Sequence, residues 1–248
     1  MSGISIHPLY LGAFPSVEKS IFTYACNQGL KFRACCIGWY INGASKKILV
    51  DTGPSDIHLA TRYHPHLGLN DKVPLEQALS KVGVKPQEIE IVIFTHLHWD
   101  HCYNLEPLSK AKFLVQKEEI QYAVSPLLIH RLGYEVNIPG LCPPWISVFD
   151  RINVLHNEEE ILPGISVVSL PGHTPGSQGV TIETTRGRYL IAGDAIPLYE
   201  NWENRTPSGI HVDLREYERT FRKIDSLKPD GILPGHDEKV FERGIIEL

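Results

Sequence analysis

The sequence lacks any uninterrupted apolar run close to the roughly 18 residues that a membrane-spanning helix requires. It also lacks a basic tail or a block of lysine and arginine. Its 24 basic and 29 acidic residues give a formal net charge of −5. Proteins that bind nucleic acid through its phosphates usually carry a basic surface. We therefore expect neither a membrane nor a nucleic-acid partner.

Two further absences concern the compartment and the cysteines. Residues 1–15 lack the positively charged segment that opens a secretory signal peptide. The five cysteines have neither the even count nor the spacing of a disulfide framework, and the sequence contains no CxxC pair. We therefore expect reduced thiols in a cytoplasmic protein, and no structural zinc site built on thiolates.

The 248 residues show no linker, internal repeat or low-complexity segment, so we interpret residues 1–248 as a single domain. Short apolar runs bounded by turn residues predict buried strands, as at 89–96. Segments with helical spacing lie between such runs. The clearest helix is predicted for 212–227, where Asp213 and Glu216 match a capping box. This alternation is typical of an α/β protein.

Histidine and aspartate recur at the ends of the predicted strands. Strand ends at one edge of a layered α/β structure converge, so side chains placed there are expected to meet in one cleft. Together the motifs aim five histidines and two or three aspartates at that cleft. The five motifs are DTG at 51, THLHWDH at 95, PGHTPG at 171, GDA at 193 and PGH at 234.

Imidazole and carboxylate groups without thiolate suit zinc, manganese, iron or cobalt. In an extended segment His96 and His98 project to the same side and can share one ion, while Asp100 and His101 turn toward a second. A carboxylate such as Asp194 can bridge the two. Seven ligands exceed the three or four of a single zinc, which predicts two divalent cations, with zinc favoured. The candidate ligands are His96, His98, Asp100, His101, His173, Asp194 and His236.

The pattern HLHWDH at 96–101, followed by the later histidine and aspartate motifs, resembles the ligand signature of the metallo-β-lactamase superfamily. Within that superfamily the chain is most similar to the N-acyl homoserine lactonase-like group of dinuclear lactonases. The resemblance extends from VDTG to PGHD and so covers nearly the whole chain. It implies an αββα sandwich, with two β-sheets face to face, helices outside, and part of the metal centre in each half. The stretches that carry the closer similarity are HLHWDHCYN, LPGHTPGSQGV, YLIAGDA and LPGHD.

The resemblance also implies a role for each candidate residue. Asp51 resembles the aspartate that orients ligand imidazoles. A hydroxide held between two metal ions would attack a lactone carbonyl, and Asp100 would pass a proton to the leaving ring oxygen. A small molecule is the implied substrate, and the family often forms homodimers. The first ion would be held by His96, His98 and His173, the second by Asp100, His101 and His236, with Asp194 bridging.

The sequence departs from the lactonases at two places. Their tyrosine three residues after the bridging aspartate is replaced by Pro197, so Tyr199 becomes the candidate for the group that contacts the substrate carbonyl. Two glycines common after the second-metal histidine are replaced by Tyr103 and Asn104. Larger side chains there are expected to narrow the site.

Other activities stay open on the same ligand set. One alternative is hydrolysis of a thioester, as in glyoxalase II-like enzymes, or of a phosphodiester. A glyoxalase II-like enzyme is expected to have a C-terminal helical region, and only a short stretch follows His236. A nuclease is expected to have a basic surface, which the charge balance lacks. A non-hydrolytic diiron or metal-binding protein is disfavoured. Flavodiiron-like proteins usually have a glutamate at the position that His98 occupies in this sequence.

Several further residues have an ordinary structural interpretation beside a functional one. Cys102 is interpreted as a small buried residue and not as a ligand. The pair His64 and His66 suggests a second metal site, but no carboxylate lies nearby in the sequence. Tyr199 and Trp202 are either a substrate wall or loop packing. The segments expected to form a lid over the site are 125–136 and 142–149.

Overall fold

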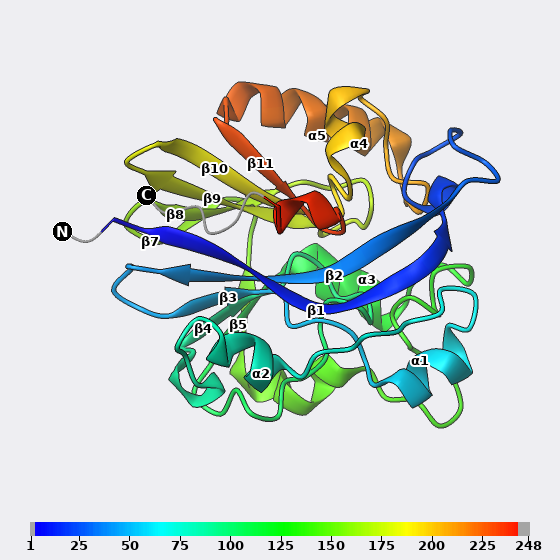
Figure 1. Cartoon of the computed structure of the whole chain (residues 1–248), viewed down its shortest axis with the longest axis horizontal. Helices are drawn as coiled ribbons and strands as arrows, with labels where there is room; N and C mark the ends of the chain where they lie inside the picture. The colour runs from blue at the N-terminus through cyan, green and yellow to red at the C-terminus, as the bar shows by residue number, and fades with distance from the viewer. Residues whose placement is uncertain (1–2, 243–248) are drawn as a thin grey trace.

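The computed structural model describes residues 3–242, and these residues form two β-sheets that lie face to face (Figure 1). The first sheet has the strand order β1-β2-β3-β4-β5-β6; β1, β2 and β3 are antiparallel neighbours, and β3 to β6 run parallel. Its strands are β1 Ser5–Glu18, β2 Lys31–Asn42, β3 Ile48–Val50, β4 Ile91–Ile93, β5 Lys112–Gln116 and β6 Ile152–Leu155.

The second sheet has the order β11-β10-β9-β8-β7, with only the β10–β11 pair parallel. Since β8 and β10 are both antiparallel to β9, the strands β8, β10 and β11 all point the same way. The strands of this sheet are β7 Glu159–Leu162, β8 Ile165–Ser169, β9 Gln178–Thr184, β10 Gly187–Gly193 and β11 Gly231–Pro234.

Helices cover the outer faces of the two sheets. In Figure 1, α4 and α5 lie above the second sheet and α1 and α2 lie below the first. Between residues 3 and 242, no helix combines the length and the apolar character needed to cross a membrane. The α-helices are α1 Ile57–Tyr63, α2 Leu75–Ser80, α3 Lys117–Val124, α4 Tyr199–Glu203 and α5 Leu214–Leu227. The 3₁₀ helices are η1 Lys19–Ile21, η2 Pro86–Glu88, η3 Pro144–Arg151 and η4 Glu238–Val240.

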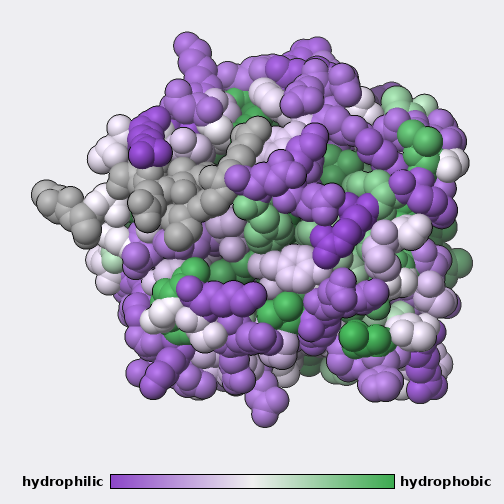
Figure 2. All heavy atoms as spheres, viewed as in Figure 1, coloured by the Kyte–Doolittle hydropathy of each residue, from purple (hydrophilic) through white to green (hydrophobic). Residues whose placement is uncertain are grey.

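Three apolar clusters separate these layers. One joins the inward side chains of both sheets, such as Ile93 and Val180. A second joins the outer face of the first sheet to α2 and α3, and a third joins the second sheet to Phe221 of α5. On the face drawn in Figure 2, hydrophilic side chains predominate and hydrophobic ones are scattered among them. The predicted αββα sandwich is confirmed.

The helix predicted for 212–227 is α5, and its start differs in one detail from the prediction. The Asp213 carboxylate accepts hydrogen bonds from the backbone N–H groups of Arg215 and Glu216, as an N-cap should. The other half of the predicted capping box was wrong. The Asp213 N–H donates to the carbonyl of Gly172, so the cap ties the helix to the PGH motif.

The five polar motifs follow β3, β4, β8, β10 and β11 directly. In the first sheet β3 and β4 are parallel, and in the second the three motif-bearing strands point the same way. Each sheet therefore presents its motifs at one edge, and the expected convergence of these side chains follows from strand direction.

Candidate metal centre

Three histidines meet at the first cluster of donor atoms. The Nε2 atom of His96 lies 3.0 Å from Nδ1 of His98, and Nε2 of His173 lies 3.0 Å from the same atom. Zinc–nitrogen bonds of ~2.0–2.1 Å in tetrahedral geometry place neighbouring ligand nitrogens roughly 3.3 Å apart. The three nitrogens thus form one face of a coordination shell sized for such a cation.

A second cluster combines Asp100, His101 and His236. The Asp194 carboxylate lies between the two clusters. Its Oδ1 is 3.4 Å from His101 Nε2 and 3.1 Å from His236 Nε2, while its Oδ2 is 3.6 Å from Nε2 of His173. Oδ2 also lies 3.2 Å from Nε2 of His236, so the carboxylate lies against both clusters, as a bridging carboxylate must.

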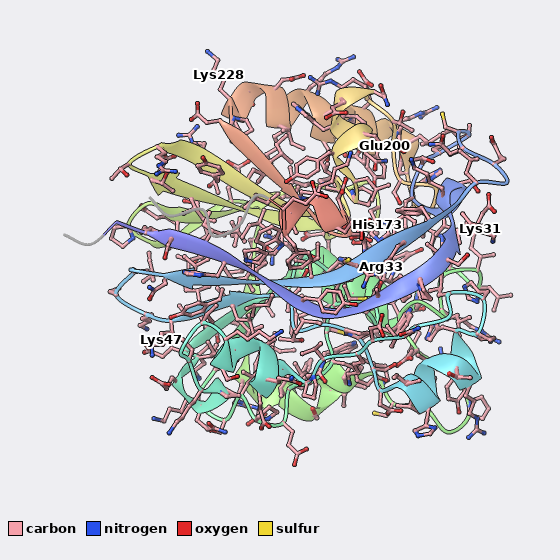
Figure 3. All side chains as sticks on the ribbon, viewed as in Figure 1. Lys31, Arg33, Lys47, His173, Glu200 and Lys228 are labelled. Atoms are coloured by element: carbon pink, nitrogen blue, oxygen red, sulfur yellow. The ribbon has the colours of Figure 1, made fainter. Side chains whose placement is uncertain are left out.

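The outer nitrogens of the ligand rings fix their tautomers. Nδ1 of His173 donates to the carbonyl of Ile210, and Nδ1 of His236 donates to the carbonyl of Cys35, each at 2.8 Å. A neutral imidazole that donates through Nδ1 keeps its lone pair on Nε2, which here points into the centre. Figure 3 marks His173 in the interior of the molecule, between the layers.

Asp51 orients two of the ligand rings, as the resemblance implied. It accepts at 2.8 Å from Nδ1 of His101, and at 2.7 Å from the Thr95 hydroxyl. Because the Thr95 hydroxyl donates its hydrogen to Asp51, it accepts a hydrogen bond from Nδ1 of His96 at 3.1 Å. Asp51, which follows β3, thus holds His101 directly and His96 through Thr95 in the tautomer that a cation requires.

The charges of the centre also suit a cation. Burial opposes ionisation of Asp194, but His236 and His101 outweigh it and hold the pKa of this carboxyl well below its usual range. Burial and neighbouring histidines lower the pKa of His96 and His98 far below the ordinary value. For His101 burial is outweighed by carboxylates, which raise its pKa to about 10. A divalent cation would replace the proton on His101.

Among the side chains of the centre that the structure describes, two buried polar atoms have no hydrogen-bond partner: Nε2 of His101 and Oδ1 of Asp194. An unsatisfied buried polar atom costs about 1–3 kcal/mol, so such atoms in a folded protein point to a missing partner. Both atoms face the centre, and the donor set is oxygen and nitrogen only. The seven side chains therefore fit divalent cations of the zinc class.

A cavity of about 500 Å³ opens directly onto the centre. Its floor contains His98, Asp100, His173, Asp194 and His236. Among the residues from 3 to 242, no lysine or arginine lines this cavity. Its apolar wall is formed by Phe14, Ile21, Phe22, Leu67, Ile129, Leu132 and Ile210.

One of the two expected lid segments lies at the cavity. Ile129, Leu132 and Gly133 line it, and Ile129 is 81% exposed at the surface. A Cβ atom on Gly133 would come within 3.0 Å of the His98 ring, so this segment packs directly on a candidate ligand. The interpretation of 142–149 as a lid was wrong, because Trp145 packs in the cluster beneath the first sheet.

The structure places Tyr199 away from the cavity. Its ring belongs to the cluster between the two sheets, and its backbone N–H donates to Asp237. Trp202 packs against Phe221 and under the Arg205 guanidinium. Neither residue lines the cavity, so the suggested role of Tyr199 at the substrate carbonyl finds no support in its position.

We therefore expect Tyr199→Phe to lower kcat/KM by less than about threefold, against the roughly hundredfold loss that follows removal of a group that stabilises the oxyanion. Steady-state kinetics of the metal-loaded variant would measure the change. A loss of kcat/KM near a hundredfold with both metals retained would show that Tyr199 takes part in the reaction.

Cys102 is fully buried, and its Sγ lies 3.5 Å from the carbonyl of Leu97. Burial raises the thiol pKa far above its ordinary value, which keeps Cys102 protonated and unsuited to bind a metal. We expect Cys102→Ala to retain the metal content and most of the activity of the parent. Elemental analysis of the purified variant tests this, and loss of an ion would contradict it.

The expectation that Tyr103 and Asn104 narrow the site was wrong. Neither residue lines the cavity. The Tyr103 hydroxyl donates to the carboxylate of Glu135, and the Asn104 amide donates to the carbonyls of Thr52 and Pro54. Asn104 has a φ of 61°, a conformation that glycine adopts freely and asparagine tolerates.

The His64 and His66 pair is also placed differently from its sequence interpretation. Both rings line the cavity, but neither belongs to a cluster of potential metal ligands in residues 3–242. A carboxylate does lie beside His64, since Nε2 of His64 is 3.0 Å from Oε1 of Glu135. No sequence signal connects these two residues.

Sequence reasoning also missed a buried carboxylate, Glu119 of α3. It accepts hydrogen bonds from the backbone of Leu97 and Gly176 and from the hydroxyls of Tyr134 and Thr174. Its side chain thereby joins the loop of the first two histidines to the loop of His173. In the sequence it is one of several glutamates near a helix start.

Several known proteins are similar to this chain in sequence. The chain is 28% identical over 172 residues to an N-acyl homoserine lactonase of Bacillus cereus, which covers 64% of this chain and 63% of that protein. It is 28% identical over 206 residues to the beta-lactamase-like protein 2 homolog of Drosophila melanogaster, and the match covers 82% of this chain and 59% of that protein. The chain thus spans less than two thirds of the length of these curated relatives.

Solved structures share the fold at lower identity. A probable metal-dependent hydrolase from Staphylococcus aureus superposes with a TM-score of 0.82 at 19% identity, covering 96% of this chain and 91% of that chain. A variant of AiiA from B. thuringiensis, with N-decanoyl-L-homoserine bound at its active site, superposes with a TM-score of 0.77 at 21% identity. The match covers 98% of this chain and 97% of that chain. Residues 38–236 match the sequence profile of the metallo-beta-lactamase superfamily, and the chain belongs to that superfamily.

Proposed function

We propose that this metallo-hydrolase holds two divalent cations, zinc favoured, on the seven clustered side chains and opens the ring of a small-molecule lactone. Bound there, the cations would polarise the ester carbonyl and acidify a water molecule as the nucleophile. The observation that carries the proposal is the cavity: members of both donor clusters line it, and its wall is largely apolar.

The cavity favours an uncharged ester over the alternatives. A phosphodiester is anionic, and an anionic substrate is usually held by lysine or arginine. None of the described residues around the cavity is of either type. The same reasoning disfavours a glutathione thioester, which carries two carboxylates. Two relatives of the chain are named N-acyl homoserine lactonase. These names describe the substrates of those proteins, and the proposal extends a lactone substrate to this chain.

The chain's own groups divide the work around the substrate. Phe22, Ile210 and Leu132 would bind the apolar part and exclude water from it. Asp100 is the ligand of the second cluster that retains exposure, with 13% of its side chain open to the cavity. Its carboxyl would carry a proton to the leaving ring oxygen, because that step needs a group that touches both centre and substrate.

The proposal is tested with a panel of homoserine, aromatic-fused and aliphatic lactones, assayed beside thioesters and phosphodiesters. Opening a lactone yields a hydroxy acid and releases a proton, so a pH indicator follows each turnover. We expect rapid turnover of at least one lactone by the metal-loaded protein. Inert lactones beside a rapidly hydrolysed thioester or phosphodiester would overturn the lactone assignment.

Metal removal tests the two-ion centre separately. We expect about two ions per chain at saturation, and loss of activity on chelation that readdition of zinc restores. Elemental analysis and metal titration measure this stoichiometry. Saturation at one ion per chain would contradict the bridging role of Asp194.

A further inference from the structure

A second group of polar side chains lies beside the same cavity and includes none of the candidate metal ligands. His64 and Glu135 are both buried, with side-chain exposures of 2% and 0%, and Nε2 of His64 lies 3.0 Å from Oε1 of Glu135. The hydroxyl of Tyr103 donates to the other carboxylate oxygen. Both oxygens of Glu135 are therefore engaged.

The ring of His64 is also held from one face. It stacks on Trp99 with 4.0 Å between ring centroids and 9° between planes. Trp99 lies between His98 and Asp100 in the ligand loop, and its backbone N–H donates to the carbonyl of Gly133. The stack places His64 beside the metal centre without making it a ligand.

The carboxylate determines what His64 offers to the cavity. An ionised carboxylate only accepts hydrogen bonds, so Nε2 of His64 carries the hydrogen that lies against Glu135. While the ring is neutral, Nδ1 then holds a lone pair. This atom makes no hydrogen bond with any described residue, and the ring lines the cavity. His64 therefore presents a fixed acceptor in a largely apolar wall.

We propose that His64, oriented by Glu135, selects lactones that carry an N–H or O–H donor next to the ring, by accepting a hydrogen bond through Nδ1. This inference rests on the proposed function and adds the substrate feature. A substrate with the donor satisfies the buried acceptor. One without it leaves Nδ1 unpaired, a loss worth about tenfold in kcat/KM.

The test compares two lactones that differ in a single group. N-hexanoyl homoserine lactone has an amide N–H beside the ring, and α-hexanoyloxy-γ-butyrolactone has an ester oxygen there instead. Chromatography separates ring-opened products from products of side-ester cleavage. We expect the parent protein to prefer the amide by about tenfold. His64→Phe keeps an aromatic ring on Trp99 and should bring the ratio close to one, mainly by lowering the rate on the amide.

Two more variants make the result decisive. His66→Phe alters a neighbouring cavity histidine that has no carboxylate partner among residues 3–242, and should leave the ratio at the parental value. If His64→Phe alone folds poorly, the double variant His64→Phe with Glu135→Gln removes the unpaired buried charge and retains an acceptor for Tyr103. Melting curves of each variant confirm that folded protein is compared.

The outcomes separate the inference from the function it rests on. An equal loss on both lactones in His64→Phe would show a purely structural role and overturn the inference. Equal rates on the two lactones in the parent would overturn it as well, with lactone opening intact. No turnover of any lactone by the metal-loaded parent would overturn the proposed function itself.

Discussion

Asp194→Asn is expected to lower turnover by well over a hundredfold, since loss of a group one shell further from a metal already costs about 10–100-fold. The Asp194 carboxylate lies against both donor clusters, with Oδ1 at 3.1 Å from His236 and Oδ2 at 3.6 Å from His173. Asparagine has the same shape, but it carries no negative charge and its nitrogen is a poor ligand. The two cations would then repel each other without compensation.

The fold should survive this change. The backbone carbonyl of Asp194 accepts a hydrogen bond from the Tyr217 hydroxyl, and the substitution leaves that bond intact. A Cβ atom on Gly235 would lie 2.5 Å from Oδ1 of Asp194, so the close approach here depends on glycine and not on the charge. Kinetics, metal content and melting temperature should be measured together.

Asp213→Asn is the matched control for Asp194→Asn. It makes the same chemical change at the N-cap of α5, where asparagine caps about as well as aspartate. We expect parental activity and metal content for Asp213→Asn. Near-parental turnover of Asp194→Asn with both metals bound would show that Asp194 does not bridge them.

The seven candidate ligands could be predicted because each lies in the loop that follows a predicted strand. His96, for example, is three positions beyond the last residue of β4. Residue type and the position of a strand end can both be predicted from local sequence. Because strand ends converge at one edge of a sheet, these local predictions also indicated which side chains meet in space. The family resemblance then assigned the ligands to two ions.

The side-chain pairings that sequence reasoning missed join distant segments of the chain. His64 and Glu135 are 71 positions apart, and Glu119 reaches Thr174 across 55 positions. Tyr199 was misplaced for a related reason. Its nearness to Asp194 in the sequence suggested the cavity, but α4 turns its ring between the sheets. Periodicity and motif spacing carry no information about such pairings.

The largest stability effect is expected at Glu119. This fully buried carboxylate accepts four hydrogen bonds, two from backbone N–H groups and two from hydroxyls. Burial raises the pKa of Glu119, and its hydrogen-bond donors oppose that rise. Glu119→Ala would leave three donors buried without an acceptor, each at about 1–3 kcal/mol, since the Thr174 hydroxyl can turn to Ser177. The free energy of unfolding should fall by several kcal/mol, a large part of the ~5–15 kcal/mol of a typical domain.

The loss should extend to metal binding, because Glu119 fixes the backbone between the first two histidines and the loop of His173. Urea denaturation of metal-free Glu119→Ala measures the stability, and metal titration of the same variant measures the affinity. Glu118→Ala is the control, since Glu118 is an exposed neighbour on α3 and its loss should cost less than about 0.5 kcal/mol. Equal stability of the two variants would mean that ordered water replaces the carboxylate at low cost, and that the two loops hold the histidines in place without it.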